Sequence, residues 1–351
     1  MTYTVDGSLP STMGSLGRRQ NVIIVGMGAV GTVLGLLLKA NSNCHVTAVC
    51  RSNYEAAKSA GIRVVSNVFG DTMFKPDTVV RSSEDAAGLR SYDFVVLTTK
   101  VLPNLIDQSE LIAPVVGKGS VIVVVQNGLQ GEAPLRARFP GNLVLPTVIY
   151  VLAARKSANT VEHKNLVRFY IGPDSAPSDK APSPTVMAPA KQFVEFLKGP
   201  NVEAVATPSI QGIKWFKMVW NGTFNPISVL SGLNDTYAMT HHPQVYKLLV
   251  SVARELWATG EAVTGQPMAT VNGVTDAESY IQASMEYHFQ PSMLQDYLAG
   301  RPMEIDALVK QPLELARKHN VPTPHLETVY CLITMVQDSH RPQSQSSSVA
   351  P

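Results

Sequence analysis

Three glycines between a β-branched segment and an apolar one constrain the fold of this chain most strongly. They stand in Gly26-Met-Gly28-Ala-Val-Gly31, which fits Gly-x-Gly-x-x-Gly and follows Val22-Ile-Ile-Val25. This order predicts a strand, a tight turn and a helix. Gly26 permits the turn, Gly28 lets the backbone approach a pyrophosphate, and Gly31 lets the helix pack closely on the strand.

The start of this helix is the expected phosphate-binding element. Its positive end, at Ala29 and Val30, faces the phosphates, and a second β-rich run at 45–50 follows at the spacing of a βαβ unit. The uncharged stretch 22–38 would also suit a signal peptide or a membrane span, but its correctly phased glycines argue against both. We therefore predict dinucleotide binding and no membrane association.

The end of the second strand indicates which nicotinamide cofactor binds. Sites for NAD usually place an Asp or Glu there, bonded to the 2′-hydroxyl of the ribose. No acidic residue occurs between Asn21 and Tyr54, and the strand ends in Arg51-Ser52-Asn53. A guanidinium and two small polar side chains suit a 2′-phosphate, although Arg51 would also serve as an ordinary surface residue. We expect NADP, used as NADPH, with Arg51 as a ligand.

Composition excludes several classes of partner. The chain of 351 residues has a formal charge of +2 and 45% apolar residues, which suggests two domains with sizeable cores. The near-neutral balance gives no electrostatic reason to expect binding to nucleic acid or an anionic membrane. Cys44, Cys50 and Cys331 show no Cys-x-x-Cys spacing, so we expect no metal site and buried thiols in a reducing compartment. We expect a cytoplasmic protein, with a mitochondrial location left open.

The hydrophobic pattern divides the chain into an α/β part and a helical part. Short apolar runs alternate with helical ones up to about residue 207, which predicts an α/β Rossmann-type doubly wound parallel sheet. The expected strands are 22–25, 45–50, 62–65, 93–98, 120–125, 143–150, 166–171 and 202–206. A helix near 188–198 belongs to the α/β part, and the helices expected after it lie near 209–224, 244–263, 276–288, 291–299 and 304–319. The expected parts are a flexible arm at 1–20, a Rossmann NADP-binding domain at 21–207, an all-α C-terminal substrate and catalytic domain at 208–338, and a disordered tail at 339–351.

Two polar groups follow strands at the carboxyl edge of the predicted sheet, where ligands of open α/β sheets bind. Lys100 follows the strand at 93–98, and Asn127-Gly128 follows the strand at 120–125. A strand-end charge and an ordinary Asn-Gly turn are the simpler interpretations. We expect both Lys100 and Asn127 to contact the cofactor.

A polar stripe crosses one apolar helix of the second domain. Lys217, Asn221 and Asn225 are spaced i, i+4 and i+8, so they share one helix face. Their neighbours belong in a core: Trp215, Phe216, Met218, Val219, Trp220 and Phe224. Asn is a poor helix former and an odd choice for a plain solvated face. A lysine and two amides in an apolar wall would instead form a site.

With these residues in view, the chain resembles ketopantoate reductases (2-dehydropantoate 2-reductases) from Asn21 to about Val336. The resemblance rests on Gly26-Met-Gly28-Ala-Val-Gly31, Thr99-Lys100, Asn127-Gly128, Lys217-Met-Val-Trp-Asn221-Gly-Thr-Phe-Asn225-Pro226, Ser292-Met-Leu-Gln-Asp296 and Glu304-Ile-Asp306. It implies a Rossmann domain plus a helical domain, NADPH as cofactor, and reduction of a branched 2-oxo acid to its D-hydroxy acid. It also implies Lys217 as general acid, Glu304 as its partner on the forming hydroxyl, and four substrate ligands: Asn221, Asn225, Asn234 and Ser292.

The chemistry of carbonyl reduction agrees with these roles. Hydride arriving at a carbonyl carbon leaves charge on the oxygen, and an ammonium both stabilises and protonates that oxygen. Burial would lower the pKa of Lys217 toward neutrality, whereas the charge of Glu304 would oppose this change. The net shift stays open at this point.

The expected substrate is 2-dehydropantoate, reduced to (R)-pantoate for pantothenate and coenzyme A synthesis. Two alternatives stay open: another branched D-2-hydroxy acid, and a non-catalytic NADP-binding redox sensor. Pro312 stands where a helix is expected, so it predicts a break or kink near the site. The sequence does not decide the oligomeric state, and a homodimer is one of the states considered.

Overall fold

The computed structural model describes residues 18–174, 182–268 and 274–340. Most of the predicted N-terminal arm and tail lie outside these ranges. The chain divides into two compact units, one formed by residues 1–126 and 131–210 and the other by 127–130 and 211–351. The sequence places Asn127 in the first domain, whereas the structure assigns Asn127–Gln130 to the second unit.

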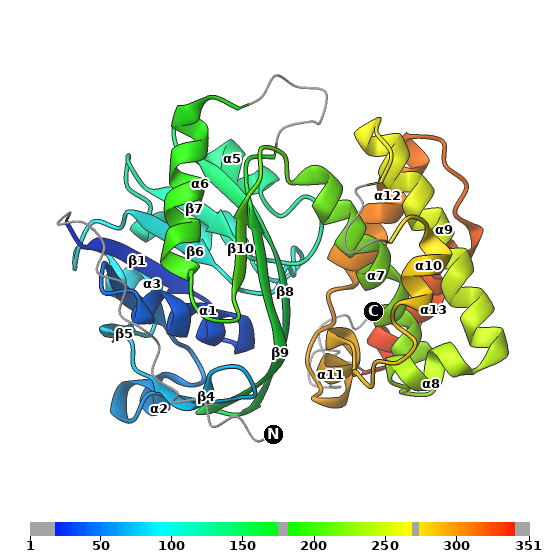
Figure 1. Ribbon diagram of the computed structural model, residues 1–351, viewed down its shortest axis with the longest axis horizontal. Coiled ribbons are helices and arrows are strands. Elements are labelled where there is room, and N and C mark those ends of the chain that lie inside the picture. Colours follow the sequence, from blue (N-terminus) through cyan, green and yellow to red (C-terminus); the bar gives the residue numbers. More distant parts are fainter. Residues whose placement is uncertain (1–17, 175–181, 269–273, 341–351) are drawn as a thin grey trace, which may run out of the picture. The chain divides into compact units, whose positions relative to one another are not determined.

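The first unit is a mainly parallel sheet with helices on both faces (Figure 1). Its described strands are β1 (Gln20–Val25), β2 (Cys44–Val49), β3 (Ile62–Ser66), β4 (Gly70–Phe74), β5 (Thr78–Val80), β6 (Phe94–Leu97), β7 (Val121–Val124), β8 (Val144–Ser157), β9 (Thr160–Ile171) and β10 (Glu203–Ala206). They lie in the order β4-β3-β9-β8-β7-β6-β1-β2-β5, with β10 paired to β9. The pairings from β8 to β5 are all parallel, whereas β8–β9 and β3–β4 are antiparallel. This topology confirms the predicted Rossmann-type fold class.

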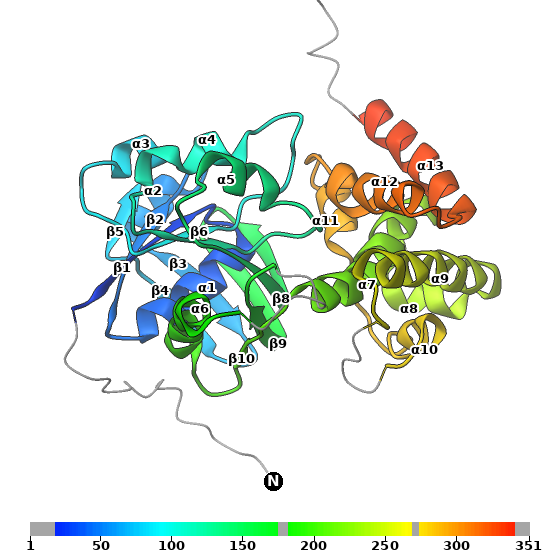
Figure 2. The same cartoon turned by 90° about the horizontal axis from the view of Figure 1, so that it is seen from above.

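Alternate residues of the central strand β1 point into two different cores. Val22 and Ile24 are buried on one face of the sheet, and Ile23 and Val25 are buried on the other. Figure 2 shows α1 and α6 on one side of the sheet and α3, α4 and α5 on the other. The helices of this unit are α1 (Ala29–Ala40), α2 (Tyr54–Ser59), α3 (Ser83–Ala86), α4 (Gln108–Ile112), the 3₁₀-helix η1 (Ala113–Val115), α5 (Ala133–Arg138) and α6 (Pro184–Leu197). Burial on both faces explains why β1 carries no charged side chain.

Some strands differ from the prediction. β8 continues beyond residue 150, where the prediction ends it, and β9 begins before residue 166, where the prediction starts it. The two strands form one long antiparallel hairpin, and β9 also pairs with β3. Residues 155–159 at its tip are exposed, so they lack the continuous apolar pattern that marks a buried strand. The same reason explains why the mostly exposed strand β4 is missing from the prediction, whereas β5 is missing because three residues are too few to show a pattern.

The second unit is a bundle of helices around α7 (Figure 1). Its helices are α7 (Gln211–Leu230), α8 (Thr236–His241), α9 (Pro243–Thr264), α10 (Ala277–Gln282), α11 (Ser292–Leu298), the π-helix η2 (Asp306–Lys310), α12 (Gln311–Lys318) and α13 (Pro324–His340). α7 packs against α9, α11 and α13. Cys331 on α13 is exposed, so the prediction of a buried thiol is wrong there, while Cys44 and Cys50 are buried. No helix in the described ranges has the length and apolar content needed to cross a membrane.

Two helices of this unit depart from their predicted course. The helix expected at 276–288 ends at Gln282, and short turns follow it, such as the Met285 N–H donating to the Gln282 carbonyl at 3.1 Å. Further on, the Phe289 carbonyl accepts from the Thr236 N–H at the start of α8, at 3.0 Å. Near Pro312 the chain forms the π-turn of η2 and then α12, with Pro312 in its first turn. Pro312 has no N–H to donate, so it begins an α-helix more readily than it continues one.

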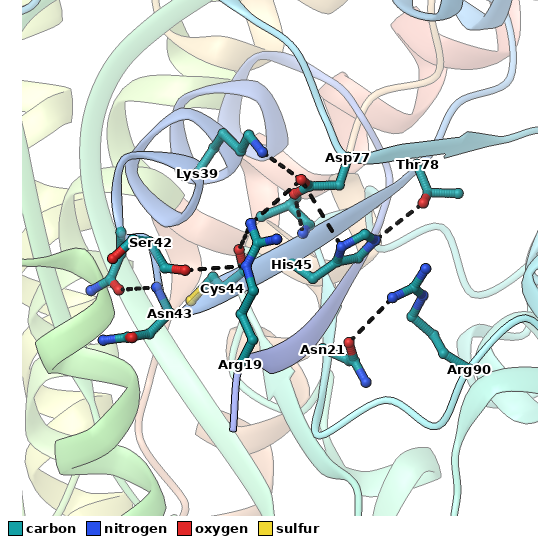
Figure 3. A network of polar contacts seen from close by, with 12 residues as sticks. Arg19, Asn21, Lys39, Ser42, Asn43, Cys44, His45, Asp77, Thr78 and Arg90 are labelled. Atoms are coloured by element: carbon teal, nitrogen blue, oxygen red, sulfur yellow. Dashed lines mark hydrogen bonds and ion pairs between the residues drawn. The ribbon is translucent and has the colours of Figure 1, made fainter. Parts of the chain in front are cut away.

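A carboxylate at the amino edge of the sheet holds α1, β2 and β5 together (Figure 3). Asp77 precedes β5, and its side chain accepts hydrogen bonds from Lys39 Nζ and from the Val46 N–H, the latter at 2.9 Å. Arg19 approaches the same carboxylate at 3.4 Å. Burial alone would raise the pKa of Asp77, but the hydrogen bonds from Lys39 and Val46 and the neighbouring positive charge lower it below its usual value.

Asp77→Asn is expected to lower the free energy of unfolding by roughly 1–3 kcal/mol at neutral pH, because several charge-assisted hydrogen bonds are lost. Since the pKa of Asp77 is lowered on folding, its contribution is present above about pH 4 and declines as the pH falls through the folded value. Urea unfolding at pH 6 and pH 3 measures this, and a deficit that does not shrink at pH 3 contradicts it. Asp71→Asn, which breaks an exposed ion pair with Arg63, is the control with a smaller expected effect.

Candidate active site

The glycine turn after β1 is shaped by two close approaches. Gly26 has a φ of +108°, and a Cβ there would lie 2.7 Å from the Thr99 nitrogen. A Cβ on Gly31 would lie 2.3 Å from the Gly26 carbonyl oxygen. Thr98 Oγ1, at the end of β6, donates to the same Gly26 carbonyl. Both positions therefore require glycine for the turn itself.

Gly28 differs from its two neighbours because nothing in the protein requires a glycine there. Its φ is −85°, and a Cβ at this position would meet no atom within 4 Å. Gly28 is also the N-cap of α1, and neither a side-chain cap nor an acidic residue in the first turn satisfies the helix N-terminus. The first N–H groups, which include those of Ala29 and Val30, are thus presented to an anion.

The turn after β2 is tied to this glycine turn. Asn53 donates from Nδ2 to the Met27 carbonyl at 3.0 Å, and its side chain is buried. Arg51, two residues before it, is exposed. Ser52 between them accepts a hydrogen bond from Arg155 Nη1 of β8 at 3.3 Å. The predicted cofactor residues Gly26, Gly28 and Arg51 therefore belong to one connected part of the first unit.

Lys100 follows the end of β6, as the sequence indicates. Its side chain is half-buried, and its carbonyl accepts from Gln108 Nε2 at 2.9 Å. Gln126, which follows β7, donates to the Thr99 carbonyl at 2.7 Å. These amide side chains fix the loops at the carboxyl ends of β6 and β7 relative to each other.

In the second unit, Asn127 joins two charged side chains. Lys217 of α7 donates from Nζ to Asn127 Oδ1 at 3.0 Å. Asn127 in turn donates from Nδ2 to Glu304 Oε2 at 3.2 Å, and Glu304 is only 7% exposed. A carboxamide has both an acceptor and donors, so Asn127 bridges the ammonium and the carboxylate.

Burial and the charge of Glu304 act in opposite directions on the pKa of Lys217. Burial lowers the pKa of the Lys217 ammonium to about 8, although the negative charge of Glu304 raises it. The loss of hydration thus outweighs the attraction to the carboxylate. An amine with a pKa near 8 is mostly protonated at neutral pH and still releases its proton readily.

The segment that carries Asn127 is anchored along its length. Lys214, one turn before Lys217 on α7, donates from Nζ to the Leu129 carbonyl. Gln311 of α12 accepts from the Leu129 N–H at 3.5 Å, and the Leu129 side chain is buried in the core of this unit. Asn127 therefore approaches Lys217 from a fixed backbone.

The remaining predicted substrate residues fall into two groups. Asn225 Oδ1 accepts from Ser292 Oγ at 3.1 Å and from the Met293 N–H at 2.9 Å, so it holds the start of α11. Asn221 lies between Lys217 and Asn225 on the same helix face and is 7% exposed. Asn234 lies beyond the end of α7 and donates to the Ser231 carbonyl at 2.6 Å, a local bond that stabilises the turn.

Comparison with known proteins identifies the family. Residues 22–176 match the model of "Ketopantoate reductase PanE/ApbA", and residues 209–337 match that of "Ketopantoate reductase PanE/ApbA C terminal". The chain belongs to the ketopantoate reductase family.

Individual members of the family and solved structures agree with this assignment. The 2-dehydropantoate 2-reductase of Methylococcus capsulatus is 30% identical, with a TM-score of 0.78 over 93% of this chain and 99% of that one. The 2-dehydropantoate 2-reductase of Mesorhizobium japonicum is 28% identical over 89% of this chain and 96% of its own length. The meiotically up-regulated gene 72 protein of Schizosaccharomyces pombe is 26% identical over 89% of this chain, but the match spans only 55% of that protein. A D-mandelate dehydrogenase with NADH and anilino(oxo)acetate shares the fold, at 17% identity and a TM-score of 0.76 over 92% of this chain and 99% of that one.

Two residues around the site are absent from the sequence-based prediction: Lys214 and Gln311, which hold the Asn127 segment. The sequence predicts Asn53 beside the 2′-phosphate, but its side chain is buried and holds the turn after β2 by bonding the Met27 carbonyl. Lys214 lies three residues before Lys217, so helical spacing offered a signal for it. Gln311 and Asn53 act on backbone groups far away in the sequence, and no local pattern marks such contacts.

Glu304→Gln is expected to lower the pKa of Lys217 further below about 8, because it removes the negative charge that raises this pKa. NMR titration of protein with ¹³Cε-labelled lysine measures this, with the Lys217 resonance assigned by its loss in Lys217→Ala. An unchanged or raised pKa contradicts the assigned coupling. Glu314→Gln, an exposed glutamate on α12, is the control that leaves the titration unchanged.

Proposed function

We propose that this ketopantoate reductase family member is an NADPH-dependent reductase of a 2-oxo acid, with 2-dehydropantoate as the substrate and (R)-pantoate as the product. The observation that carries the proposal is the Lys217 ammonium, with a pKa of about 8, held by Asn127 beside Glu304. Such an arrangement is suited to protonating an oxygen that gains negative charge.

The residues of the first unit fit a dinucleotide. The open space at Gly28 and the uncapped N-terminus of α1 suit a pyrophosphate. Arg51 and Ser52 after β2, where an acidic residue would favour NAD, suit the 2′-phosphate of NADP. When bound, NADPH supplies the hydride; Lys100 and Asn127 remain candidate ligands.

The residues of the second unit supply the proton and hold the acid. Lys217 Nζ donates a hydrogen bond to the 2-oxo oxygen and transfers its proton as that oxygen becomes a hydroxyl. Glu304 accepts from the new hydroxyl and stabilises the ammonium between turnovers. Asn221 donates to the substrate carboxylate or hydroxyl. Ser292 spends its one hydrogen on Asn225 Oδ1, which positions it, so Ser292 Oγ accepts a hydrogen bond from the substrate hydroxyl. The carboxamide of Asn234 is a further proposed ligand of the substrate, through its oxygen or its nitrogen.

Gly28→Ala is expected to leave the free energy of unfolding within about 0.5 kcal/mol of wild type, since the new methyl group meets no protein atom. It is expected to weaken NADPH binding about tenfold or more, because that methyl group occupies the space left for the pyrophosphate. Chemical denaturation and NADPH fluorescence titration measure the two effects. If Gly28→Ala binds NADPH as tightly as wild type does, the pyrophosphate does not bind at Gly28.

Gly31→Ala is the matched control for that experiment. Its Cβ would lie 2.3 Å from a backbone oxygen, so it is expected to destabilise the fold itself.

Lys217→Ala is expected to reduce turnover of 2-dehydropantoate about 10²- to 10⁴-fold, the range for loss of a general acid, with NADPH affinity retained. Oxidation of NADPH followed by absorbance, with wild type and variant side by side, gives the measurement. Lys247→Ala, an exposed lysine of α9, is the control with unchanged turnover. Near-normal turnover by Lys217→Ala would exclude Lys217 as the acid.

The same assay separates the alternatives. The D-mandelate dehydrogenase that shares this fold makes a panel of 2-oxo acids with branched and aromatic substituents the natural choice. The acid with the highest kcat/KM identifies the substrate. If wild type binds NADPH but oxidises it with none of these acids, the protein is a redox sensor and the proposed reaction is wrong.

A further inference from the structure

Two arginines near the end of β2 are not neutralised by carboxylates. In the ranges that the structure describes, Arg51 and Arg155 have no carboxylate within ion-pair distance. The nearby Glu55 pairs instead with Arg81, and Glu162 pairs with Lys156 at 2.9 Å. Both unpaired side chains are exposed. Their positive charge is therefore available to an anionic ligand.

The fold places Arg155 beside the residue that follows Arg51. Arg155 lies near the end of β8, opposite Val161 of β9, in the long hairpin that the sequence did not predict. Its Nη1 donates to Ser52 Oγ at 3.3 Å. The neighbouring Asn53 is tied to the Met27 carbonyl of the glycine turn. A group bound at Ser52 is thus close in structure to the proposed pyrophosphate position.

The hydrogen-bonding capacity of this cluster suits a phosphate. Ser52 Oγ accepts from Arg155, which leaves its own hydrogen free to donate to a phosphate oxygen. Arg155 uses one of its five N–H donors on Ser52, so several remain for a second acceptor. Planar guanidinium groups recognise phosphate oxygens through paired hydrogen bonds.

We infer that Arg155 is a specificity-determining residue that binds the 2′-phosphate of NADP together with Arg51 and Ser52. The inference rests on the proposed function, in which NADPH is the reductant. Arg155 comes from β8, about one hundred residues after the strand end that usually decides between NAD and NADP. Arg155 is therefore a second positively charged ligand for the 2′-phosphate, in addition to Arg51, which the sequence indicates.

The test compares ligands that differ only in the 2′-phosphate. In Arg155→Gln, the dissociation constants of NADPH and of adenosine 2′,5′-bisphosphate are expected to rise about tenfold. Those of NADH and 5′-AMP are expected to stay within about twofold, because these ligands lack the group that Arg155 contacts. Calorimetry and fluorescence titration measure all four. The loss is expected to shrink when the salt is raised to about 1 M, since the site is exposed.

Two further variants separate recognition from a general effect of charge or folding. Lys156→Gln removes one positive charge from the next residue of the same strand, where Glu162 already neutralises it, and is expected to bind all four ligands as wild type does. Arg155→Lys keeps the charge without the planar fork and is expected to lie between wild type and Arg155→Gln. All three variants are expected to melt at the wild-type temperature, because both side chains are exposed.

The outcomes distinguish this inference from the proposed function. If Arg155→Gln binds NADPH as tightly as wild type does, or weakens NADPH and NADH equally, Arg155 is not a 2′-phosphate ligand and the reductase proposal stands. If wild type binds neither NADPH nor the bisphosphate, the NADPH-dependent function fails, and the role of Arg155 fails with it.

Discussion

A lysine ammonium that is partly withdrawn from water is central to the proposed chemistry of the second unit. Such a charge is tolerated only when hydrogen bonds and an opposite charge replace its hydration. Asn127 supplies the hydrogen-bond acceptor, and Glu304 supplies the charge. Burial lowers the pKa of Lys217 to about 8 in spite of Glu304, which suits an amine that serves as an acid near neutral pH. The core of Trp215, Phe216 and their neighbours keeps water away from the base of the helix.

The segment with Asn127 belongs to the second unit, although its neighbours in the chain belong to the first. Asn127–Gln130 lies in the chain between β7 (Val121–Val124) and α5 of the sheet, yet it packs with the helices. Lys214 and Gln311 hold it by its backbone, so its side chain meets Lys217 and Glu304 in a fixed orientation. The helical unit is therefore completed by four residues that its own continuous sequence does not contain. A change in this segment would alter the hydrogen bonding of Lys217 without changing a residue of α7.

Much of this arrangement could be predicted from local patterns. The glycine turn follows from spacing and β-branched flanks, and the helix with Lys217, Asn221 and Asn225 follows from an interval of four residues. The partners of these groups could not be predicted in the same way. Nothing near Asn127 in the sequence indicates that it meets Lys217, and the hairpin that carries Arg155 lacks the apolar alternation of a buried strand. Long-range hydrogen bonds depend on tertiary packing, which a periodic pattern does not encode. The resemblance to ketopantoate reductases indicated Glu304, and the structure adds the amide that joins it to Lys217.

The central claim is that the amine at position 217 donates the proton, and rebuilding that amine tests it most directly. Lys217→Cys, made in a Cys331→Ser background because Cys331 is exposed, places a thiol where the ammonium stood. Alkylation of this thiol with 2-bromoethylamine restores an amine at nearly the same reach. The account predicts that the unmodified variant turns over 2-dehydropantoate very slowly and that alkylation, confirmed by mass spectrometry, recovers a large part of the wild-type rate. Complete alkylation without recovery, or full activity before alkylation, would contradict it.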